Sequence, residues 1–420
     1  MSELSYLEKL LDGVEVEWVP VSELFQIKNG YTPSKSKKEF WENGTIPWFR
    51  LEDVRVNGRE LNDSIQHINP LGVKGCLFPK NSIFMSTTAT IGEYALVRVP
   101  YLTNQQITNF SISEKFSEAV NIKYIFYRFY DFGKWCTENA NKSGGVSIIG
   151  LKKLSQYQFP IPCPDNPEKS LAIQSEIVRI LDKFTALTAE LTAELNMRKK
   201  QYNYYRDQLL SFEDGEVEWK ALGTICQIGD GNHSSKYPKA NEMIEQGIPF
   251  IRGTNMVNGT ICNQDMKYIS KEKHNELKKG HLKAFDVLIA NRGEVGKVAY
   301  VPEGYSGSNL NSQLAWLRAN PEIIINRYLF FILCSSTIQN KLSGEGGALQ
   351  QLTIKNIKNI QIPVPSITVQ SNIVSFLDKF DSLTNSISEG LPREIELRQK
   401  QYEYYRDLLF SFPKPETVSK

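Results

Sequence analysis

Residues 198–212 read RKKQYNYYRDQLLSF, and residues 398–412 read RQKQYEYYRDLLFSF. The two stretches are identical at 11 of 15 positions, at an offset of 200 residues. Upstream of each, QSEIVRILDKF at 174–184 returns as QSNIVSFLDKF at 370–380, with 8 of 11 positions identical. A period this long does not fit a solenoid, whose unit is a few tens of residues. The sequence therefore predicts a duplicated domain joined to a duplicated helical connector.

The segments between these helical copies repeat only faintly. Residues 46–50 read IPWFR and residues 248–252 read IPFIR, while LKKLSQYQFPIP at 151–162 returns as IKNIKNIQIPVP at 354–365. The offset between the copies drifts by a few residues, as insertions in surface loops would make it do. Helices that stay alike between segments that diverge indicate one scaffold used twice to present two different surfaces.

Composition bounds the class of protein without deciding it. A chain of 420 residues with 41% hydrophobic and 23% charged residues is ordinary for two or three globular domains, and its net charge of +2 neither requires nor excludes nucleic acid. We expect no membrane span, because no run of 18 apolar residues occurs. The first residues, MSELSYLEKLLDG, lack the pattern of a signal peptide. Six scattered cysteines without a C-x-x-C pair are typical of reduced thiols in a cytoplasmic protein.

The connectors carry a heptad-like apolar seam. In the first copy, steps of four and three join Ile177, Ile180, Phe184, Leu187, Leu191 and Leu195, with one extra step of four, which is the stutter of a coiled coil. The second copy is interrupted by Gly390 and Pro392, where we expect a kink or break. Because a seam needs a partner, we predict two long antiparallel coiled-coil helices that hold two globular domains apart. The alternative is a pair of ordinary core helices.

The globular segments indicate mixed α/β (α+β) domains. Short β-rich runs at 82–85 and 287–290 lie among turn signals, and residues 120–132 and 323–334 have helical patterns. Residues 6–13 resemble the end of the first connector, so we predict a cyclic, pseudo-twofold arrangement. The predicted plan is an N-terminal helical segment (1–12), domain 1 (13–165), a central helical region (166–213), domain 2 (214–366), a distal helical region (367–412) and a C-terminal tail (413–420).

Motifs for catalysis are missing. Gly296-Lys297 is followed by Val298, without the glycine and Ser/Thr that a P-loop needs, and no Asn-Pro-Pro-aromatic motif occurs. The four histidines form no metal-ligand spacing. We therefore expect no catalytic residues and no metal site, and a binding or assembly subunit rather than an enzyme.

The layout resembles the specificity subunit of type I restriction–modification enzymes along essentially the whole chain. In that family two variable target-recognition domains are separated by conserved helical regions, and each domain reads half of a split DNA site. Residues 188–195 read Thr-Ala-Glu-Leu twice. This tandem TAEL looks like the IC class, where the number of copies tunes the spacing between half-sites. The other explanation is that Ala, Glu and Leu are simply good helix formers.

The resemblance implies the partners of the chain. They are double-stranded DNA, two modification (methyltransferase) subunits that carry S-adenosylmethionine, and two restriction subunits that use ATP and Mg²⁺ to translocate and cleave. This chain would bind no cofactor itself. We expect its QYxYYRD blocks to serve subunit docking or helix pairing, with purely intramolecular packing as the other possibility; their residues are Tyr202, Tyr205, Arg206, Tyr402, Tyr405 and Arg406. The alternative function is a coiled-coil interaction scaffold that does not recognise DNA.

Two equivalent loops are the first candidates for DNA contact, because both follow Gln-Ile and mix small polar, basic and aromatic residues. They resemble the family's G-x-T-P and D-G-x-H patterns, although a solvated loop without a role is the alternative. Their candidates are Thr32, Ser34, Lys35, Lys37 and Lys38 in loop 1 (residues 28–38), and Asn232, His233, Ser234, Ser235, Lys236 and Tyr237 in loop 2 (residues 229–237).

Further candidates occupy matching positions outside these loops. Arginine can bind guanine or phosphate and glutamine can read adenine, but buried or idle side chains are the alternative. These candidates are Arg50, Arg252, Thr87, Thr88, Asn291, Arg292 and Gln350. Because the two domains differ at almost all candidate positions, we predict an asymmetric bipartite DNA target with two unlike half-sites.

Overall fold

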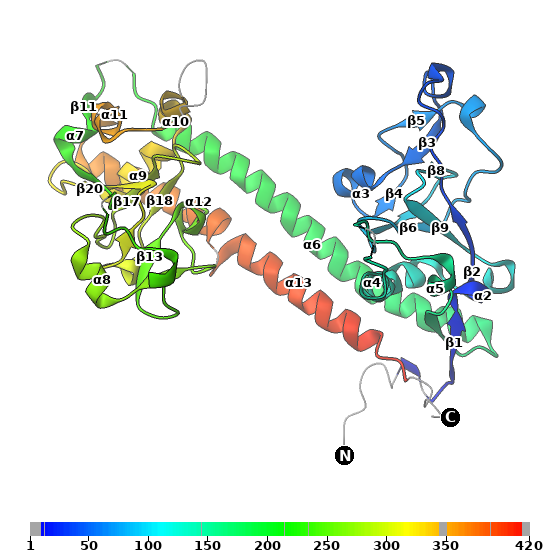
Figure 1. Cartoon of the computed structure of the whole chain (residues 1–420). Helices are drawn as coiled ribbons and strands as arrows, with labels where there is room; N and C mark the ends of the chain where they lie inside the picture. The colour runs from blue at the N-terminus through cyan, green and yellow to red at the C-terminus, as the bar shows by residue number, and fades with distance from the viewer. Residues whose placement is uncertain are drawn as a thin grey trace. The chain divides into compact units, whose positions relative to one another are not determined.

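The chain is organised as two compact units, Met1–Leu187 with Gln399–Lys420, and Thr188–Arg398. The computed structural model describes residues 10–11, 13–143, 145–213, 215–233, 235–343, 351–386 and 388–413. The predicted N-terminal segment (1–12) and C-terminal tail (413–420) lie almost entirely outside these residues. Figure 1 shows a sheet-rich domain in each unit, with long helices running into both.

Domain 1 is built from three sheets and short helices. A two-stranded sheet pairs β1 with β10, a five-stranded sheet has the order β2-β9-β6-β7-β4, and a three-stranded sheet has the order β5-β3-β8. The strands are β1 (Val16–Pro20), β2 (Phe25–Asn29), β3 (Ile46–Phe49), β4 (Glu60–Leu61), β5 (His67–Ile68), β6 (Ser82–Ser86), β7 (Tyr94–Val97), β8 (Leu102–Thr103), β9 (Ile107–Ile112) and β10 (Gln158–Pro162). The helices are α2 (Val21–Leu24), α3 (Leu51–Asn57), α4 (Ile122–Glu138) and α5 (Leu151–Leu154), with 3-10 turns η1 (Lys38–Phe40), η2 (Pro70–Gly72) and η3 (Glu114–Phe116).

Domain 2 repeats this plan. Its sheets have the orders β11-β21, β12-β20-β17-β18 and β16-β13-β19, with an added β14-β15 hairpin. The strands are β11 (Glu218–Ala221), β12 (Cys226–Asp230), β13 (Ile248–Ile251), β14 (Met256–Val257), β15 (Thr260–Ile261), β16 (Lys267–Ile269), β17 (Val287–Ala290), β18 (Val298–Tyr300), β19 (Asn309–Leu310), β20 (Leu314–Ala319) and β21 (Gln361–Val364). The helices are α7 (Leu222–Ile225), α8 (Lys271–Glu276), α9 (Asn326–Cys334), α10 (Ser336–Ser343) and α11 (Ile354–Asn359), with 3-10 turns η4 (Ala240–Glu242), η5 (Gly253–Asn255) and η6 (Glu303–Tyr305).

The strand pairing confirms the duplication at the level of register. β3 pairs in parallel with β8 through Trp48 and Leu102, and β13 pairs in parallel with β19 through Phe250 and Asn309. Two parallel strands must be joined by a long crossover connection. In both domains this connection contains strands of the larger sheet, β6 and β7 in domain 1 and β17 and β18 in domain 2. The mixed α/β prediction is therefore confirmed, as are the strands predicted at 82–85 and 287–290 and the helices predicted at 120–132 and 323–334.

Aromatic packing forms the core of domain 1. α4 begins after Asn121, whose side chain accepts a hydrogen bond from the backbone of Lys123 at 2.9 Å, the usual device of a helix N-cap. Its Phe129 packs edge-on against Phe25 and Phe110 with ring centroids 5.9 and 5.3 Å apart, a favoured aromatic geometry. The helix is thereby fixed on the face of the five-stranded sheet.

The connectors are α6 (Pro167–Leu209), α12 (Ile367–Asn385) and α13 (Gly390–Leu409). The predicted break in the distal connector is confirmed between α12 and α13. Ser386 Oγ accepts a hydrogen bond from the backbone of Glu389 at 3.1 Å, which stabilises the turn before α13. Gly390 has a φ of +75°, and a Cβ there would lie 2.5 Å from the Ser382 carbonyl oxygen. Only glycine fits this break without displacing the end of α12.

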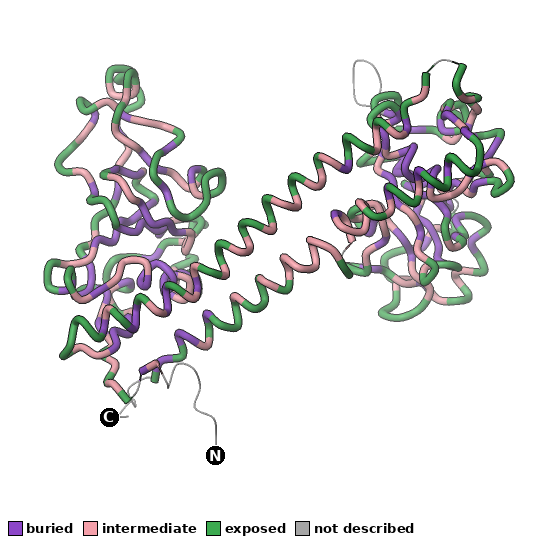
Figure 2. Tube along the Cα trace, turned by 180° about the vertical axis from the view of Figure 1, so that it is seen from behind, coloured by how far each residue is buried: buried purple, intermediate pink, exposed green. Residues whose placement is uncertain are grey.

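Equivalent aromatic contacts join the connectors inside each unit. In the first unit, Phe184 of α6 stacks on Tyr405 of α13 at 5.2 Å. In the second unit, Tyr205 of α6 packs on Phe380 of α12 at 5.7 Å. These are the same two repeat positions, paired once in each unit. Between these contacts, residues 185–201 of α6 are half-buried or exposed and none is buried (Figure 2).

The C-terminal end of the chain completes the N-terminal unit. Phe410 and Phe412 lie in the core of domain 1, and Trp18 Nε1 donates a hydrogen bond to the Pro413 carbonyl at 2.9 Å. The repeat counterparts Leu210 and Phe212 pack on the core of domain 2. Each domain thus receives the end of one long helix, as the predicted cyclic order requires.

A buried glutamine attaches each domain to the start of its following helix. Gln174 of α6 accepts from the Asn121 backbone N–H at 2.8 Å and donates to the Ala119 carbonyl at 2.9 Å. Gln370 of α12 makes the same pair of bonds with Ile325 at 2.9 Å and Ile323 at 3.0 Å. Both glutamine side chains are fully buried, so their amide groups depend on these backbone partners for hydrogen bonds.

We predict that Gln174→Ala lowers the free energy of unfolding by about 3 kcal/mol, because it leaves a half-buried N–H and a half-buried carbonyl without their partners. Urea unfolding followed by circular dichroism measures the change. Gln208→Ala, on the exposed side of the same helix, is the control and should change stability by less than about 0.5 kcal/mol. Equal effects of the two variants would contradict the anchoring role.

Candidate nucleic-acid interface

Loop 1 starts from a glycine packed against the end of β8. The Gly30 and Tyr31 backbone N–H groups donate to Ile107 and Thr103 carbonyls, each at 2.9 Å. A Cβ on Gly30 would lie 2.3 Å from the Asn104 carbonyl oxygen, so no other residue fits without moving the backbone. This close approach fixes where loop 1 leaves the sheet.

Three lysines of loop 1 are available to bind an anion. Lys35, Lys37 and Lys38 are exposed, and no carboxylate among the described residues lies within ion-pair distance of them. Thr32 donates a hydrogen bond to Gln105, and Ser34 Oγ lies 2.8 Å from Ser36 Oγ. The loop therefore presents unpaired positive charge on an internally hydrogen-bonded turn.

Loop 2 leaves its sheet at the equivalent glycine, but its side chains differ from those of loop 1. A Cβ on Gly231 would lie 2.1 Å from the Asn311 carbonyl oxygen, which matches the constraint at Gly30. His233 Nε2 lies 3.0 Å from Asp230 Oδ2, and Lys236 Nζ lies 3.9 Å from Glu276. Asn232 is buried, Ser235 is exposed, and the Tyr237 ring packs edge-on against Phe250 at 5.7 Å. Ser234 lies outside the described residues.

Arg50 and Arg252 occupy equivalent positions after β3 and β13. The Arg50 backbone N–H donates to the buried Asp53 carboxylate at 2.7 Å, and that of Arg252 donates to the buried Asn255 side chain at 3.1 Å. Arg50 also makes an ion pair with Glu52 at 2.9 Å. Among the described residues neither Nε atom has a hydrogen-bond partner, although both are buried. The two domains thus hold the arginine backbone in the same way, whereas the Arg252 guanidinium donates to the Asp265 carbonyl instead of pairing with a carboxylate.

Four further candidates follow the ends of β6 and β17. Thr87 and Asn291 are buried, and Thr87 Oγ1 lies 2.8 Å from Thr108 Oγ1. Thr88 bridges to Ile148, and the exposed Arg292 bridges to Gln351, at matching places in the two domains. Thr87 and Asn291 therefore support the local fold, while Thr88 and Arg292 reach the surface. Gln350 lies outside the described residues. DNA contact by any of these candidates stays a prediction.

A basic segment of domain 2 does not follow Gln-Ile and was therefore not among the predicted candidates. Segment 267–283 contains β16, α8 and the turn after α8, and reads KYISKEKHNELKKGHLK. Lys279 Nζ lies 3.3 Å from Asp230 Oδ1, and the Cβ position of Gly280 is 3.1 Å from Gly231 Cα. The segment therefore flanks loop 2. Its density of lysines was the sequence signal that could have identified it.

The QYxYYRD blocks divide into buried and exposed tyrosines. Tyr202 is buried in the core of domain 2, and burial raises the pKa of its phenol. The Arg406 guanidinium lies 3.6 Å from the Tyr130 ring centroid and pairs with Asp407 at 2.7 Å. Arg206 likewise pairs with its neighbour Asp207 at 2.9 Å, and Tyr402 packs on the domain 1 core. These residues, with the helix contacts of Tyr205 and Tyr405, serve packing within each unit.

Two tyrosines of these blocks remain uncovered. Tyr204 is 62% exposed and its repeat counterpart Tyr404 is 64% exposed. Large aromatic side chains with this exposure often mark a surface where another protein binds. The repeat thus places the same exposed aromatic side chain near the end of each long helix, where it contacts only the ring of the next tyrosine among the described aromatic residues.

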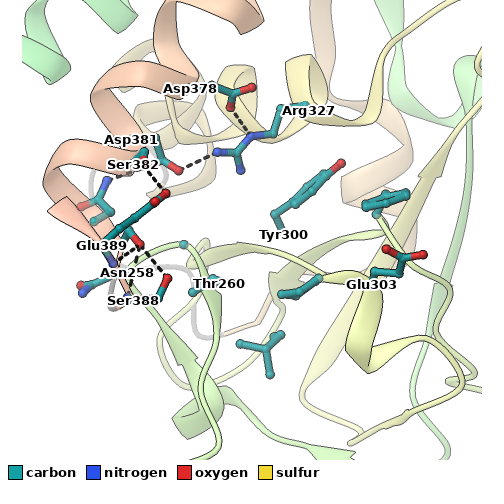
Figure 3. Close-up of a pocket in the computed structure, with 16 residues that line it drawn as sticks. Asn258, Thr260, Tyr300, Glu303, Arg327, Asp378, Asp381, Ser382, Ser388 and Glu389 are labelled. Carbon is teal, nitrogen blue, oxygen red and sulfur yellow. Dashed lines mark hydrogen bonds and ion pairs between the residues drawn. The ribbon is translucent and has the colours of Figure 1, made fainter. Parts of the chain in front are cut away.

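A pocket of about 570 Å³ lies in domain 2 beside the α12–α13 break. Figure 3 shows Arg327 between Asp378 and Asp381, each 2.6 Å from the guanidinium. The repeat counterpart of Arg327 is Lys123, which pairs with the Asp182 carboxylate at 2.9 Å. In both domains this ion pair ties a domain helix to its connector, so the Arg327 cluster has a structural role.

The described part of the chain offers no cluster of metal-ligating side chains. Its His, Cys, Asp and Glu residues form no group of three or more suited to hold a metal ion. Its helices include none that is both long enough and apolar enough to cross a membrane.

Two unlike loop-bearing surfaces on one repeated scaffold define a duplicated recognition protein. The type I restriction modification DNA specificity domain matches residues 13–198 and 215–397. The specificity subunit of the type I restriction enzyme EcoprrI from Escherichia coli is 46% identical over 399 residues, covering 93% of each chain. The EcoR124I/EcoR124II specificity subunit, also from Escherichia coli, is 42% identical over 433 residues and covers all of both chains.

A solved structure agrees on the fold. The crystal structure of the type I S subunit from M. genitalium covers 96% of this chain and 98% of its own, with a TM-score of 0.54 at 16% identity. The chain belongs to the family of type I restriction–modification DNA specificity subunits. The predicted family and fold class are therefore confirmed, whereas the IC-class assignment from the TAEL repeat stays a prediction.

We predict that Gly231→Ala weakens specific DNA binding at least tenfold, because the added Cβ must displace loop 2 from the end of β19. Gel retardation of the assembled complex on its target measures the loss. Gly304→Ala is the matched control in the same domain, because a Cβ there meets nothing within 4 Å. Unchanged binding by Gly231→Ala would show that loop 2 does not contact DNA.

Proposed function

We propose that this chain supplies the DNA sequence specificity of a type I restriction–modification complex, with each domain reading one half of an asymmetric bipartite site. The observation that carries the proposal is the equivalence of Gly30 and Gly231. Both glycines hold a loop at the end of the same parallel strand pair, but the two loops differ in sequence. Because the same scaffold carries two loops of different sequence, we expect the two domains to bind two different half-sites.

The side chains of the loops suit two kinds of DNA contact, one that recognises bases and one that positions the protein on the duplex. Base edges are read by hydrogen-bonding side chains in the grooves, while contacts to phosphate orient the protein on the duplex. Thr32, Ser34 and His233 have groups for base edges, and the exposed lysines of loop 1 have charge for phosphates. Arg50 and Arg252 can serve either purpose, because guanidinium binds both guanine and phosphate.

The helical regions are the proposed docking sites of the catalytic partners. Two modification subunits with S-adenosylmethionine would bind near Tyr204 and Tyr404, one at each exposed tyrosine. Two restriction subunits with ATP and Mg²⁺ would then join the complex, and this chain itself would bind no cofactor. The tandem TAEL in α6 would set the spacer, since four helical residues add about 6 Å. We place this complex in the cytoplasm, together with the DNA that it reads.

The proposal is tested by selection from randomised DNA. The chain assembled with modification subunits is mixed with random duplexes, and the retained duplexes are sequenced. We expect two fixed blocks of unlike sequence separated by a gap of constant length without base preference. Retention without any sequence preference would favour the scaffold alternative, in which the long helices only hold proteins together.

We predict that Tyr204→Ala with Tyr404→Ala weakens docking of the modification subunits by tenfold or more, because exposed aromatic residues are frequent binding hot spots. Analytical ultracentrifugation of the mixed subunits measures the loss. The thermal unfolding of the variant should stay close to that of the parent, since both side chains are mostly exposed. Full assembly by the double variant would place docking elsewhere on the chain.

A further inference from the structure

We propose that segment 267–283 of domain 2 is a dedicated phosphate-binding surface, which holds the DNA backbone beside loop 2. This inference rests on the proposed function and adds a division of labour within domain 2. The segment would position the duplex through its charge, and loop 2 would be left to contact base edges. Domain 1 would combine both tasks in loop 1.

The charge of the two domains is distributed differently between equivalent elements. Loop 1 (residues 28–38) has four lysines and no acidic residue, whereas residues 229–239 around loop 2 have two lysines and Asp230. Segment 267–283 has six lysines against two glutamates, a net charge of +4, while the corresponding residues 66–80 of domain 1 have two lysines. The concentrated positive charge therefore lies on the loop in domain 1 and on the neighbouring segment in domain 2.

The segment is a folded element that lies against loop 2. α8 begins after Ser270, whose Oγ accepts from the Lys273 backbone at 3.1 Å. The Lys273 ammonium is held by Glu242 at 2.7 Å and Glu276 at 3.1 Å, which ties α8 to the chain that follows loop 2. The Gly280 turn then meets Gly231, as described above. The segment and loop 2 thus form one continuous surface.

The lysines that would contact phosphate are the ones without an internal partner. Lys267, Lys278 and Lys283 are exposed, and within the described ranges no carboxylate approaches them to ion-pair distance. The Lys279 side chain is 61% exposed and lies near the Asp230 carboxylate. Unpaired ammonium groups on a rigid element release counterions when they meet phosphates, which makes affinity fall with rising salt.

The proposal excludes a role for these lysines in choosing bases. A lysine at a phosphate weakens binding about equally on every sequence when it is removed, and lowers the salt slope by about 1. A lysine at a base edge instead changes the preferred base at one position. The two roles therefore have different signatures in the same binding assay.

The test uses the chain assembled with modification subunits and its selected duplex. The slope of log binding constant against log salt is measured for the parent and for Lys278→Gln with Lys283→Gln. We expect the slope to fall by about 2, with affinity reduced to the same degree on specific and unrelated DNA. Repeated selection with the variant should return the parent motif.

Lys355→Gln with Lys358→Gln is the matched control, because it removes the same charge from exposed lysines of α11 in the same domain. α11 and α8 lie at opposite ends of domain 2 (Figure 1). The control should leave the slope unchanged. An unchanged slope in Lys278→Gln with Lys283→Gln, or an equal change in both variants, would overturn the proposal. Absence of specific binding by the parent complex would overturn the proposed function itself.

Discussion

The junction between each domain and its following long helix is the constraint on which the structure depends. Gln174 and Gln370 each bond a backbone N–H and a carbonyl of the loop before the main domain helix. The two glutamine side chains are fully buried and the groups they bond are half-buried, so losing either glutamine would leave these polar groups without their partners. The tyrosine at the start of each domain helix adds a second tie, from Tyr124 to the Pro160 carbonyl and from Tyr328 to the Pro363 carbonyl.

This constraint accounts for the uneven repetition of the chain. Residues at the junctions and on the helix contacts must fit both a domain and a helix, so the two copies stay alike. The surface loops do not have to fit both a domain and a helix. A glycine fixes the point at which each loop leaves the sheet, and the rest of the loop is not constrained in this way. Loop 1 and loop 2 can therefore diverge in charge and hydrogen-bonding groups while the sheets beneath them keep the same register.

Much of the architecture could be predicted because its signals are local. The repeated QYxYYRD blocks, the strands at 82–85 and 287–290, and the break at Gly390 each depend on a few neighbouring residues. The parallel pairing of β3 with β8 could not be predicted, because the partners are about fifty residues apart and neither strand has a distinctive pattern. Pairing of that kind depends on the whole core.

The candidate surface was predicted less completely than the fold. Thr87 and Asn291 were chosen from their place after a strand, but burial depends on the neighbouring elements and turns both side chains inward. Segment 267–283 was missed because its proximity to loop 2 arises only when Gly280 packs on Gly231. Charge alone along the sequence did not indicate which lysines would share a face.

The most direct test of the account is the methylation pattern that this chain confers. The chain would be co-expressed with a type I modification subunit in a host without DNA methylation, and the genome read by single-molecule sequencing. The account predicts a split motif with two unlike halves and one methyladenine per half, on opposite strands. A continuous or palindromic motif would contradict it, as would absence of new methylation despite formation of a stoichiometric complex.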